Sequence, residues 1–352
     1  MELKSKIRRY WAKRKFPTVL IVALVHLLVM YLIFSNSSFQ KAEPVRKFQP
    51  FLLLDGQPFR SSSLDKQRIY ADPISLFNVS DFKFIVNQPE ICDNRPDLRS
   101  IVIIHTAPKH FVLRNAIRRT WASQLSNVVP VIFLVGQTED TEHQKRLSEE
   151  ILTQQDVIQG SFIDHYHNLT YKYLMGLLWT RIYCRQVSVI LKGDDDIFVN
   201  MPRYVNLVDE LQKTGRNKGD GKILTCYEIV DNGIVRRSAN SKWNVPLDEY
   251  PHSKFPTYCP GAVVILNNRA IDDILDSVNH SPYVWVDDAY VTGVLADAGK
   301  VQPKKLNESH ICRRLPHNAN KTLLKHCKQA AFGPLQLSIK EINRLWSALH
   351  VN

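Results

Sequence analysis

Three consecutive aspartates, Asp194, Asp195 and Asp196, carry the clearest chemical signal in the chain. They lie between two apolar runs, residues 189–191 and residues 197–199. Adjacent carboxylates repel one another, and burial at a strand end makes that repulsion more costly. A hard divalent cation such as Mg2+ or Mn2+ relieves it and can bridge a carboxylate to nucleotide phosphates. The triplet therefore predicts a metal-assisted nucleotide site, with an inert acidic turn as the alternative.

A second acidic pair, Asp287 and Asp288, lies in the apolar stretch VWVDDAYVTG (residues 284–293). A carboxylate that aromatic side chains shield from water has a raised pKa and can serve as a general base. Acidic residues are also favoured at a helix N-terminus by the helix dipole, and both interpretations can hold together. One acidic cluster for a metal and another for proton abstraction is the combination that sugar transfer from a nucleotide sugar requires.

Two arginines, Arg114 and Arg118, are four positions apart in a stretch of helical character, so they share one helix face. Two guanidinium groups on one face could grip a diphosphate. Surface solvation, or pairing with nearby carboxylates, is the alternative. The stretch GRNKGDGK (residues 215–222) has the wrong spacing for a phosphate-binding loop, and no G-x-S-x-G motif of a serine hydrolase occurs in the sequence.

The elements that must position these side chains alternate between short apolar runs and longer stretches with helical patterning. Strand candidates are residues 100–104, 130–135, 157–162, 187–191, 223–225 and 261–266, and helix candidates are residues 111–121, 139–153, 171–183, 270–278 and 338–349. This alternation is typical of an α/β domain with a parallel-rich sheet. Ligands of such sheets bind beyond the carboxyl ends of strands, where we expect the aspartate triplet.

The N-terminal region predicts a membrane anchor. Half of the net charge of +12 lies in a tail, residues 1–17, where seven Lys and Arg residues oppose one Glu. Because no basic helical stripe with interleaved aromatics follows, we expect no nucleic-acid partner. Residues 18–34 carry no formal charge, and their basic N-terminal flank predicts a single-pass signal anchor with a luminal C-terminus. A cleaved signal peptide is the alternative.

The rest of the chain is consistent with the lumen of the secretory route. Residues 35–80 lack a sustained period and predict a stem, which leaves residues 81–352 as the luminal catalytic domain. All six cysteines follow the anchor, and an even number in an oxidising compartment predicts disulfides, although many pairings are open. Six N-x-S/T sequons also follow it, and the short apolar span suits the thinner membranes of the early secretory route.

Seven segments of the chain together resemble the β1,3-glycosyltransferase family, which includes β1,3-galactosyl- and β1,3-N-acetylglucosaminyltransferases. In the family's order they are FIVNQPEIC (84–92), RNAIRRTW (114–121), VIFLVG (131–136), FIDHYHNLTYK (162–172), KGDDDIFVN (192–200), FPTYCPGAVVIL (255–266) and VDDAYVTG (286–293). The resemblance implies a GT-A fold, in which a Rossmann-like nucleotide-sugar-binding domain with a mixed, parallel-rich sheet follows one transmembrane helix.

The resemblance also implies roles for matching positions. The family's D-x-D motif corresponds to Asp194 and Asp196, and Asp196 is the residue expected to bind the metal directly. Asp288, supported by Asp287, matches the catalytic base. The residues expected around the uridine diphosphate are Arg114, Arg118, Asp164, Lys172, Asp194 and Asp195. Pro260 and Gly261 match a loop near the transferred sugar and the acceptor.

The implied activity is an inverting β1,3-transfer of a hexose, with galactose from UDP-galactose favoured, onto an acceptor glycan of a glycoprotein or glycolipid. The implied cofactor is Mn2+ or another divalent cation, and the implied location is the Golgi membrane; a homo-oligomer is left open. Transfer of N-acetylglucosamine from UDP-GlcNAc is the alternative within the class. A catalytically silent glycan-binding or chaperone protein is the alternative of another class, and the intact acidic clusters argue against it.

Two departures from the family pattern matter. The acceptor loop carries Ala262, Val263 and Val264 where the family has more glycine and an aromatic residue, so acceptor choice stays open. Many members also have a histidine before the last amphipathic helix as a candidate metal ligand, and residues 332–336 of this chain contain none. The candidates to replace it are His310, His317, His326 and water.

Overall fold

The computed structural model describes residues 82–217, 221–315 and 321–350, which belong to one compact unit, Phe51–Asn352. The predicted tail, anchor and stem (residues 1–17, 18–34 and 35–80) lie outside these described residues. None of the helices that the structure describes is long and apolar enough to cross a membrane.

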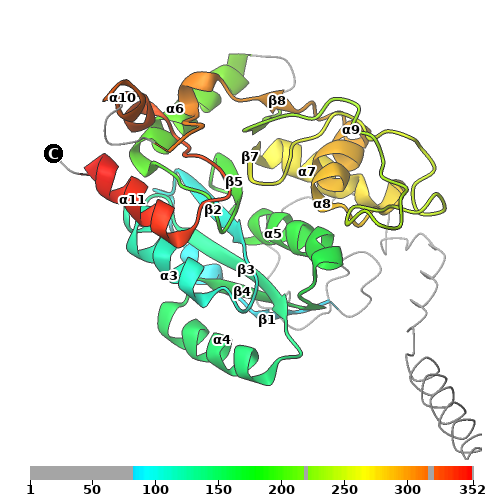
Figure 1. Cartoon of the computed structure of the whole chain (residues 1–352), viewed down its shortest axis with the longest axis horizontal. Coiled ribbons are helices and arrows are strands. Elements are labelled where there is room, and N and C mark those ends of the chain that lie inside the picture. The colour runs from blue at the N-terminus through cyan, green and yellow to red at the C-terminus, as the bar shows by residue number, and fades with distance from the viewer. Residues whose placement is uncertain (1–81, 218–220, 316–320, 351–352) are drawn as a thin grey trace, which may run out of the picture. The chain divides into compact units, whose positions relative to one another are not determined.

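A mixed sheet forms the centre of the described domain, with the strand order β1-β4-β3-β2-β5-β7-β6-β8 (Figure 1). The strands are β1 Phe84–Val86, β2 Ser100–His105, β3 Val131–Gln137, β4 Val157–Ile163, β5 Val189–Asp194, β6 Leu224–Cys226, β7 Val263–Asn267 and β8 Lys304–Lys305. Strands β4, β3, β2 and β5 run parallel, whereas β7 is antiparallel to β5 and β1 is antiparallel to β4. The prediction of a mixed, parallel-rich α/β sheet is confirmed.

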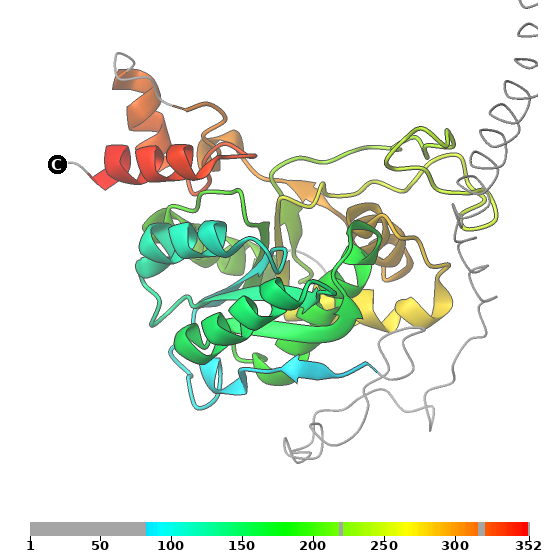
Figure 2. The same ribbon diagram turned by 60° about the horizontal axis from the view of Figure 1, so that its bottom comes forward.

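The parallel strands are apolar on both faces because helices cover both sides of the sheet. The helices are α3 Phe111–Arg119, α4 Thr141–Gln154, α5 Leu169–Tyr183, α6 Met201–Asn217, α7 Asn268–Asp276, α8 Asp287–Ala289, α9 Ala296–Ala298, α10 Lys321–Gln329 and α11 Ile339–His350. A π-helical turn, η5 Tyr290–Leu295, joins α8 to α9. Figure 2 allows these layers to be followed from a second direction.

Side-chain alternation along the strands divides the core into two apolar clusters. In β2, Ile101 and Ile103 belong to a cluster that includes residues of α5 and α7. Val102 and Ile104, on the opposite face, belong to a cluster that includes residues of α3, α4, α6 and α11. Neighbouring residues of a strand point to opposite faces, so both clusters follow from one continuous apolar run.

Strand β5 lies where the sheet changes from parallel to antiparallel pairing. It pairs with β2 in parallel and with β7 in antiparallel register, with Gly193 opposite Val263. The carboxyl end of β5 therefore lies beside the loop that leads into β7, and the amide of Asp194 donates to the carbonyl of Ala262 at 3.3 Å. This register brings the aspartate triplet next to residues 258–262, which are far from it in the sequence.

The structure also fixes points that the sequence leaves open. The cysteine pairs are Cys92–Cys184, Cys226–Cys259 and Cys312–Cys327, so all six cysteines are paired. Gly136 lies within β3, so this strand runs two residues beyond the predicted range 130–135. The strand extends to Gln137 because its last residues still pair with β4, and the amide of Asp164 donates to the carbonyl of Gln137 at 2.7 Å.

Candidate active site

The three aspartates at the end of β5 have different surroundings. One carboxylate oxygen of Asp194 accepts a hydrogen bond from Lys192 Nζ at 2.7 Å. The carboxylate of Asp195 is held by Thr106 Oγ1 at 2.6 Å and lies 2.7 Å from His110 Nδ1. No described residue forms an ion pair with Asp196, whose pKa is raised to about 6 by burial and by the charges of its two neighbours. Asp196 is thus the member of the triplet whose charge lacks a direct partner.

Lys192 lies between the two acidic clusters. It is 1% exposed, although a lysine is costly to bury unless it is paired. Its Nζ donates to Asp194 and to the carbonyl of Gly261, and it lies 5.3 Å from the ring centre of Tyr173. Sequence reasoning assigned Lys192 no role. The available signal was a lysine inside an apolar strand, two residues before the triplet.

Gly261 connects the two acidic clusters through its backbone hydrogen bonds. Its amide hydrogen-bonds Asp288, while its carbonyl accepts from Lys192. A Cβ atom on Gly261 would lie 3.1 Å from Lys192 Nζ, which is a tight contact, and 3.7 Å from Asp288 Cβ, which is ordinary van der Waals contact. A glycine at this position therefore lets the lysine head group approach the loop backbone closely.

Asp287 and Asp288 form an electrostatically coupled pair at the start of α8. Burial is the main cause that raises the pKa of both carboxyl groups. For Asp287 the charge of Asp288 adds to this effect, and Lys192 opposes it. Asp288 Oδ1 accepts from the amide of Ala289 at 2.7 Å, which favours its charged form. A carboxylate pair with raised pKa is suited to accept a proton from a hydroxyl group.

A hydrogen bond holds the Gly261 loop against the helical segment that carries this pair, and a disulfide holds the loop against β6. The buried Thr292 Oγ1 accepts from the amide of Cys259 at 2.9 Å and lies 2.7 Å from the carbonyl of Asp288, to which it donates. The disulfide Cys226–Cys259 ties the same loop to β6. The spacing between the loop and Asp288 is therefore set by covalent and hydrogen-bonded contacts.

Asp164 and Lys172 lie at the same edge of the sheet. Lys172 Nζ is 2.8 Å from the carboxylate of Asp164 and donates to the carbonyl of Thr106 at 2.6 Å, just beyond the end of β2. The amide of Gly136 donates to Asp164 Oδ2 at 2.7 Å. Burial lowers the pKa of Lys172, and the charges of Asp164, Asp195 and Asp287 oppose that shift. The structure thus brings this pair within electrostatic reach of both acidic clusters.

Arg114 and Arg118 pair with carboxylates, which was the alternative to gripping a diphosphate. Arg114 is fully buried and binds Glu150 at 2.6 Å as well as the carbonyls of Ala107 and Pro108 at 2.7 and 3.0 Å. These partners occupy its guanidinium group, and the phosphate contact stays a prediction. Arg114 instead holds the loop after β2, which carries Thr106, to α4.

Arg118 is likewise occupied. Its guanidinium group makes a bidentate pair with Asp156 at 2.7 and 2.8 Å, and its Nη1 lies 2.7 Å from Glu150 Oε1. It also lies over the ring of Phe133 at 4.7 Å. These contacts fix α3 to the end of α4 and the start of β4. Glu150 and Asp156 are 32 or more positions away from Arg118 in the sequence. The spacing of residues along the chain therefore could not reveal these ion pairs.

Two of the three histidine candidates for the metal site have other contacts. His326 Nε2 lies 2.8 Å from the carbonyl of Ile311, and His310 Nε2 lies 3.4 Å from Glu210. His317 lies outside the described residues. The histidine-free segment 332–336 nevertheless runs beside the triplet, because the next amide, of Leu337, donates to the carbonyl of Asp196 at 2.8 Å.

The oxygen donors of the triplet suit a hard divalent cation, but they do not form a closed protein cage. No group of three or more His, Cys, Asp or Glu side chains in the described parts of the chain is arranged to hold a metal. Lys192 contacts Oδ1 of Asp194, and Thr106 and His110 both contact Oδ2 of Asp195, whereas Asp196 has no such side-chain contact among the described residues. Ions such as Mg2+ are often bound by one or two carboxylates together with substrate phosphates, and this donor set fits that mode.

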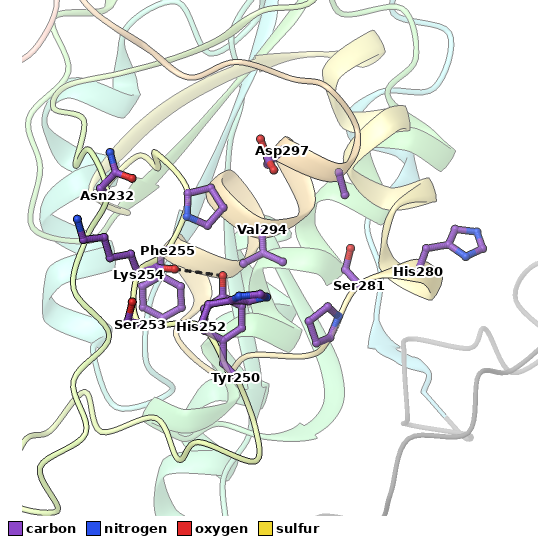
Figure 3. A pocket seen from close by; sticks show the side chains of 13 residues that line it. Asn232, Tyr250, His252, Ser253, Lys254, Phe255, His280, Ser281, Val294 and Asp297 are labelled. Carbon is purple, nitrogen blue, oxygen red and sulfur yellow. Dashed lines mark hydrogen bonds between the residues drawn. The ribbon is translucent and has the colours of Figure 1, made fainter.

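A separate pocket of about 570 Å³ is lined by no residue of the two acidic clusters (Figure 3). Its lining residues are Asn232, Tyr250, His252, Ser253, Lys254, Phe255, Pro256, His280, Ser281, Pro282, Val294, Asp297 and Ala298. Tyr250 and Phe255 stack with ring centres 5.0 Å apart, and the Tyr250 hydroxyl donates to the carbonyl of Lys254 at 3.4 Å. None of the predicted site residues lines this pocket, so the convergence of carboxylates defines the candidate active site.

Proteins of known family match most of this chain. The model of the galactosyltransferase family matches residues 113–307. "Beta-1,3-galactosyltransferase 1" of Homo sapiens is 32% identical over 275 residues, which cover 77% of this chain and 79% of that protein. "Lactosylceramide 1,3-N-acetyl-beta-D-glucosaminyltransferase A" of Danio rerio is 28% identical over 275 residues, covering 74% of this chain and 69% of that protein.

Among solved structures, a glycosyltransferase involved in glycosylation of the major capsid of PBCV-1 covers 70% of this chain and 98% of its own, at 12% identity. Its TM-score of 0.37 is too low to carry an argument. The assignment rests instead on the family model and the curated relatives, which confirm the resemblance and the hexosyltransferase class predicted from the motifs. The matched region also contains the aspartate triplet, the Gly261 loop and the Asp287–Asp288 pair. The chain therefore belongs to the galactosyltransferase family.

Proposed function

We propose that the protein is an inverting β1,3-galactosyltransferase with a GT-A-type domain, which moves galactose from UDP-galactose to a hydroxyl group of an acceptor glycan. The single observation that carries this proposal is the meeting of two acidic clusters around Lys192 and Gly261 at the carboxyl end of β5. One cluster suits the diphosphate side of a donor sugar, and the other suits the attacking hydroxyl group.

In the proposed reaction the acceptor oxygen attacks C1 of galactose as the bond from C1 to the diphosphate oxygen breaks. Asp288 accepts the hydroxyl proton, and uridine diphosphate leaves from the opposite face, which inverts the configuration at C1. General-base assistance of this kind typically contributes about 10²–10⁴-fold in rate. Burial raises the pKa of Asp288, which supports the role, since a raised pKa favours proton transfer at neutral pH.

Asp196, with Asp194, would hold a divalent cation, for which Mn2+ is the expected identity. Bound there, the cation supplies charge neutralisation for the departing diphosphate. Asp164 and Lys172 would support the nucleotide side of the site at the ends of β2 and β3, with Asp195 fixing the loop after β2. Arg114 would act on this region through the same loop.

N-acetylglucosamine transfer is the second candidate because relatives of both kinds match the chain. The N-acetylglucosaminyltransferase of Danio rerio is 28% identical to this chain, and the galactosyltransferase of Homo sapiens is 32% identical. The match also covers a larger share of the galactosyltransferase than of the N-acetylglucosaminyltransferase. The match to the galactosyltransferase, together with the family model, supports galactose. A silent glycan-binding protein is disfavoured because both acidic clusters are intact.

We further propose that the protein is a type II single-pass Golgi membrane protein with its catalytic domain in the lumen. The basic tail, the uncharged residues 18–34 and the position of every cysteine beyond them support this location. The three disulfides of the described domain are consistent with an oxidising compartment.

A donor and acceptor screen tests the activity. The purified protein would be incubated with Mn2+ and each of UDP-galactose, UDP-GlcNAc, UDP-GalNAc and UDP-glucose, against methyl glycosides of common terminal sugars. We expect a product with a new β1,3-linked galactose, identified by linkage analysis. Product with N-acetylglucosamine would select the second candidate, and the absence of transfer with every donor would refute the activity.

A further inference from the structure

Two large aromatic side chains, Tyr166 and Trp243, lie exposed on the surface beside the proposed active site. Tyr166 is 43% exposed and Trp243 is 46% exposed. Although they are 77 positions apart in sequence, Trp243 Nε1 donates a hydrogen bond to the Tyr166 hydroxyl oxygen at 2.9 Å. An exposed aromatic side chain leaves apolar area in contact with water. Two exposed rings that a hydrogen bond holds together therefore indicate a ligand-binding surface.

These rings are part of a fixed assembly. Trp285 is 7% exposed, and the ring of His167 stacks on it with centres 4.1 Å apart at an angle of 11°. Tyr166 contacts the same ring edge-on at 5.9 Å. We call Tyr166, His167, Trp243 and Trp285 the aromatic platform.

The buried member of the platform is anchored by its polar groups. The indole nitrogen of Trp285 donates to the carbonyl of Asn244 at 3.0 Å, and its amide donates to Glu249 Oε1 at 3.0 Å. The hydroxyl of Thr170 in α5 also lies 3.0 Å from the carbonyl of Trp285. The segment around Trp243 and the segment around Tyr166 therefore meet on one rigid base, so the exposed rings are preorganised.

The platform is next to the candidate general base. Trp285 precedes Asp287 by two residues. Burial is the main cause that raises the pKa of Tyr166, and the charges of Asp287, Asp288 and Asp194 add to it. Tyr166 therefore lies within electrostatic reach of both acidic clusters. A molecule resting on the exposed rings would lie beside the carboxylates that accept the proton.

The chemistry of the platform fits a sugar ring. A pyranose has an apolar face of C–H groups and a rim of hydroxyl groups. Aromatic rings can pack against the apolar face, and the polar groups of Tyr and Trp side chains can hydrogen-bond to the hydroxyl groups of the rim. The Tyr166 oxygen accepts from Trp243, which leaves its own hydroxyl proton to donate, and Lys242 Nζ lies 4.3 Å from the Trp243 ring centre as a further donor.

We propose that the aromatic platform binds a sugar ring of the acceptor glycan and presents its hydroxyl group to the Asp287–Asp288 pair. This inference rests on the proposed function, because the acceptor is the second substrate of that reaction. It assigns acceptor recognition to the segments around residues 166 and 243, in addition to the loop of Pro260 and Gly261. Trp243 and Tyr166 are binding residues in this assignment and take no part in donor binding.

The test compares Trp243→Ala and Trp243→Phe in the full-length protein, with Leu247→Ala as the control. Leu247 is 67% exposed in the same segment and is not part of the platform. The probes are the methyl β-glycosides of galactose, N-acetylglucosamine and lactose, chosen because a methyl aglycone offers no aromatic ring of its own. Each protein is measured for acceptor KM, donor KM, acceptor-independent hydrolysis of the UDP-sugar, and glycoside binding by saturation-transfer NMR in the presence of UDP and Mn2+.

For Trp243→Ala we expect the acceptor KM and the glycoside Kd to rise about tenfold, with smaller rises of about threefold for Trp243→Phe, since a phenyl ring restores part of the stacking surface. Donor KM and donor hydrolysis should stay at the wild-type level, and Leu247→Ala should match the wild type throughout. Tyr166→Phe, which keeps the ring and removes the hydroxyl proton, should give a rise like that of Trp243→Phe. A purely structural role for Trp243 would instead change the donor parameters together with the acceptor parameters.

The two proposals can fail separately. Wild-type protein that binds a glycoside through the platform but transfers no sugar would refute the proposed function and leave the platform assignment standing. Wild-type protein that transfers sugar while Trp243→Ala keeps a normal acceptor KM and Kd would overturn the platform assignment. A wild-type protein that binds none of the three glycosides, or a Trp243→Ala protein that loses donor hydrolysis, would overturn it as well.

Discussion

At the level of single residues, Asp287 and Asp288 are neighbours whose hydrogen bonds differ. Asp288 accepts from the amides of Ala289 and Gly261, and both contacts favour its charged form. For Asp287 the repulsion from Asp288 ranks directly after burial among the causes that raise its pKa. The member that faces the Gly261 loop is therefore the one whose charged form receives more hydrogen bonds, which suits a base that accepts a proton.

We expect Asp288→Asn to lower turnover about 100-fold or more, because the amide keeps the size of the side chain and removes the basic oxygen. Donor binding should stay close to the wild-type value. Asp287→Asn should reduce turnover less. Turnover and donor affinity measured on both variants decide the assignment. Near-normal turnover in Asp288→Asn with loss in Asp287→Asn would reassign the base, and loss of donor binding in both would make the pair part of the nucleotide site.

The same pair predicts a pH dependence. A base must be ionised, so kcat/KM should fall as the pH is lowered through the pKa of the pair, which lies above the ordinary aspartate value of 3.8. Replacing Asp287 by Asn removes a negative neighbour, which makes ionisation of Asp288 easier and lowers its pKa. The acid limb of the profile should therefore move to lower pH in Asp287→Asn. An unchanged acid limb would show that the two carboxyl groups are not coupled.

Asp196 predicts a stability effect that is independent of activity. Its pKa of about 6 in the folded state exceeds the ordinary 3.8, so the stability it contributes below 3.8 is lost as the pH rises through about 6. Asp196→Asn should therefore raise the free energy of unfolding at pH 7.5 by about 1 kcal/mol after solvent screening, and the Tm by roughly 2 °C. Both should change little at pH 4. Thermal unfolding with and without Mn2+ and UDP is the measurement.

The same experiment compares the wild type and Asp196→Asn with and without the ligands Mn2+ and UDP. Mn2+ with UDP should raise the Tm of the wild type, because binding to the folded state alone stabilises it, and should raise that of Asp196→Asn far less. An equal rise in both proteins would show that Asp196 does not hold the cation. A lower Tm for the variant at pH 7.5 without metal would show that the Asp196 carboxylate already has a stabilising partner.

At the level of elements, the sequence predicts best what depends on local pattern. Strands β2, β3, β4 and β5 and helices α3, α4, α5 and α11 follow from apolar runs and helical spacing, and each was predicted within a few residues. The short strands β1 and β8 and the helices α6 and α10 were not predicted. Two- and three-residue strands carry too little pattern, and they form because a neighbouring strand offers hydrogen bonds.

The candidate site also has features that the local sequence pattern predicts and features that it does not. The acidic clusters can be recognised because their residue types are unusual in apolar surroundings. The partner of each charge is a tertiary property, since Lys192 meets Gly261 across 69 positions and Arg118 meets Asp156 across 38. For this reason the two arginines were expected at a diphosphate, and Lys192 was given no role. Sequence spacing reports helix neighbours but carries no information about contacts between separate elements.

The contact between the Gly261 loop and the helical segment that starts at Asp287 can be tested through Thr292. Thr292→Val keeps the shape of the buried side chain but leaves the amide of Cys259 without its acceptor and removes the bond to the carbonyl of Asp288. We expect a loss of stability of about 1–3 kcal/mol and a lower turnover at unchanged donor KM. Thr292→Ser retains the hydroxyl group and should restore most of both. Equal losses in the two variants would assign the effect to packing of the methyl group.

At the level of the whole molecule, catalysis and membrane attachment are assigned to separate parts of the chain. Both acidic clusters, the Gly261 loop and the three disulfides lie within residues 82–350. The tail and the predicted anchor lie in residues 1–34. The anchor should therefore set the location of the enzyme and the orientation of its domain, whereas the chemistry should depend on the domain alone.

Removal of residues 1–34 tests this separation. A protein of residues 35–352 behind a cleavable secretion signal should be released into the medium, because the uncharged span that would hold it in the membrane is absent. It should carry N-glycans, since all six sequons lie within it, and should keep the turnover of the full-length protein toward soluble acceptors. The full-length protein should stay in the membrane fraction after carbonate extraction, with an N-terminal tag open to protease in intact microsomes. Release of the full-length protein, a protected tag, or loss of turnover on removing residues 1–34 would each contradict the division of roles.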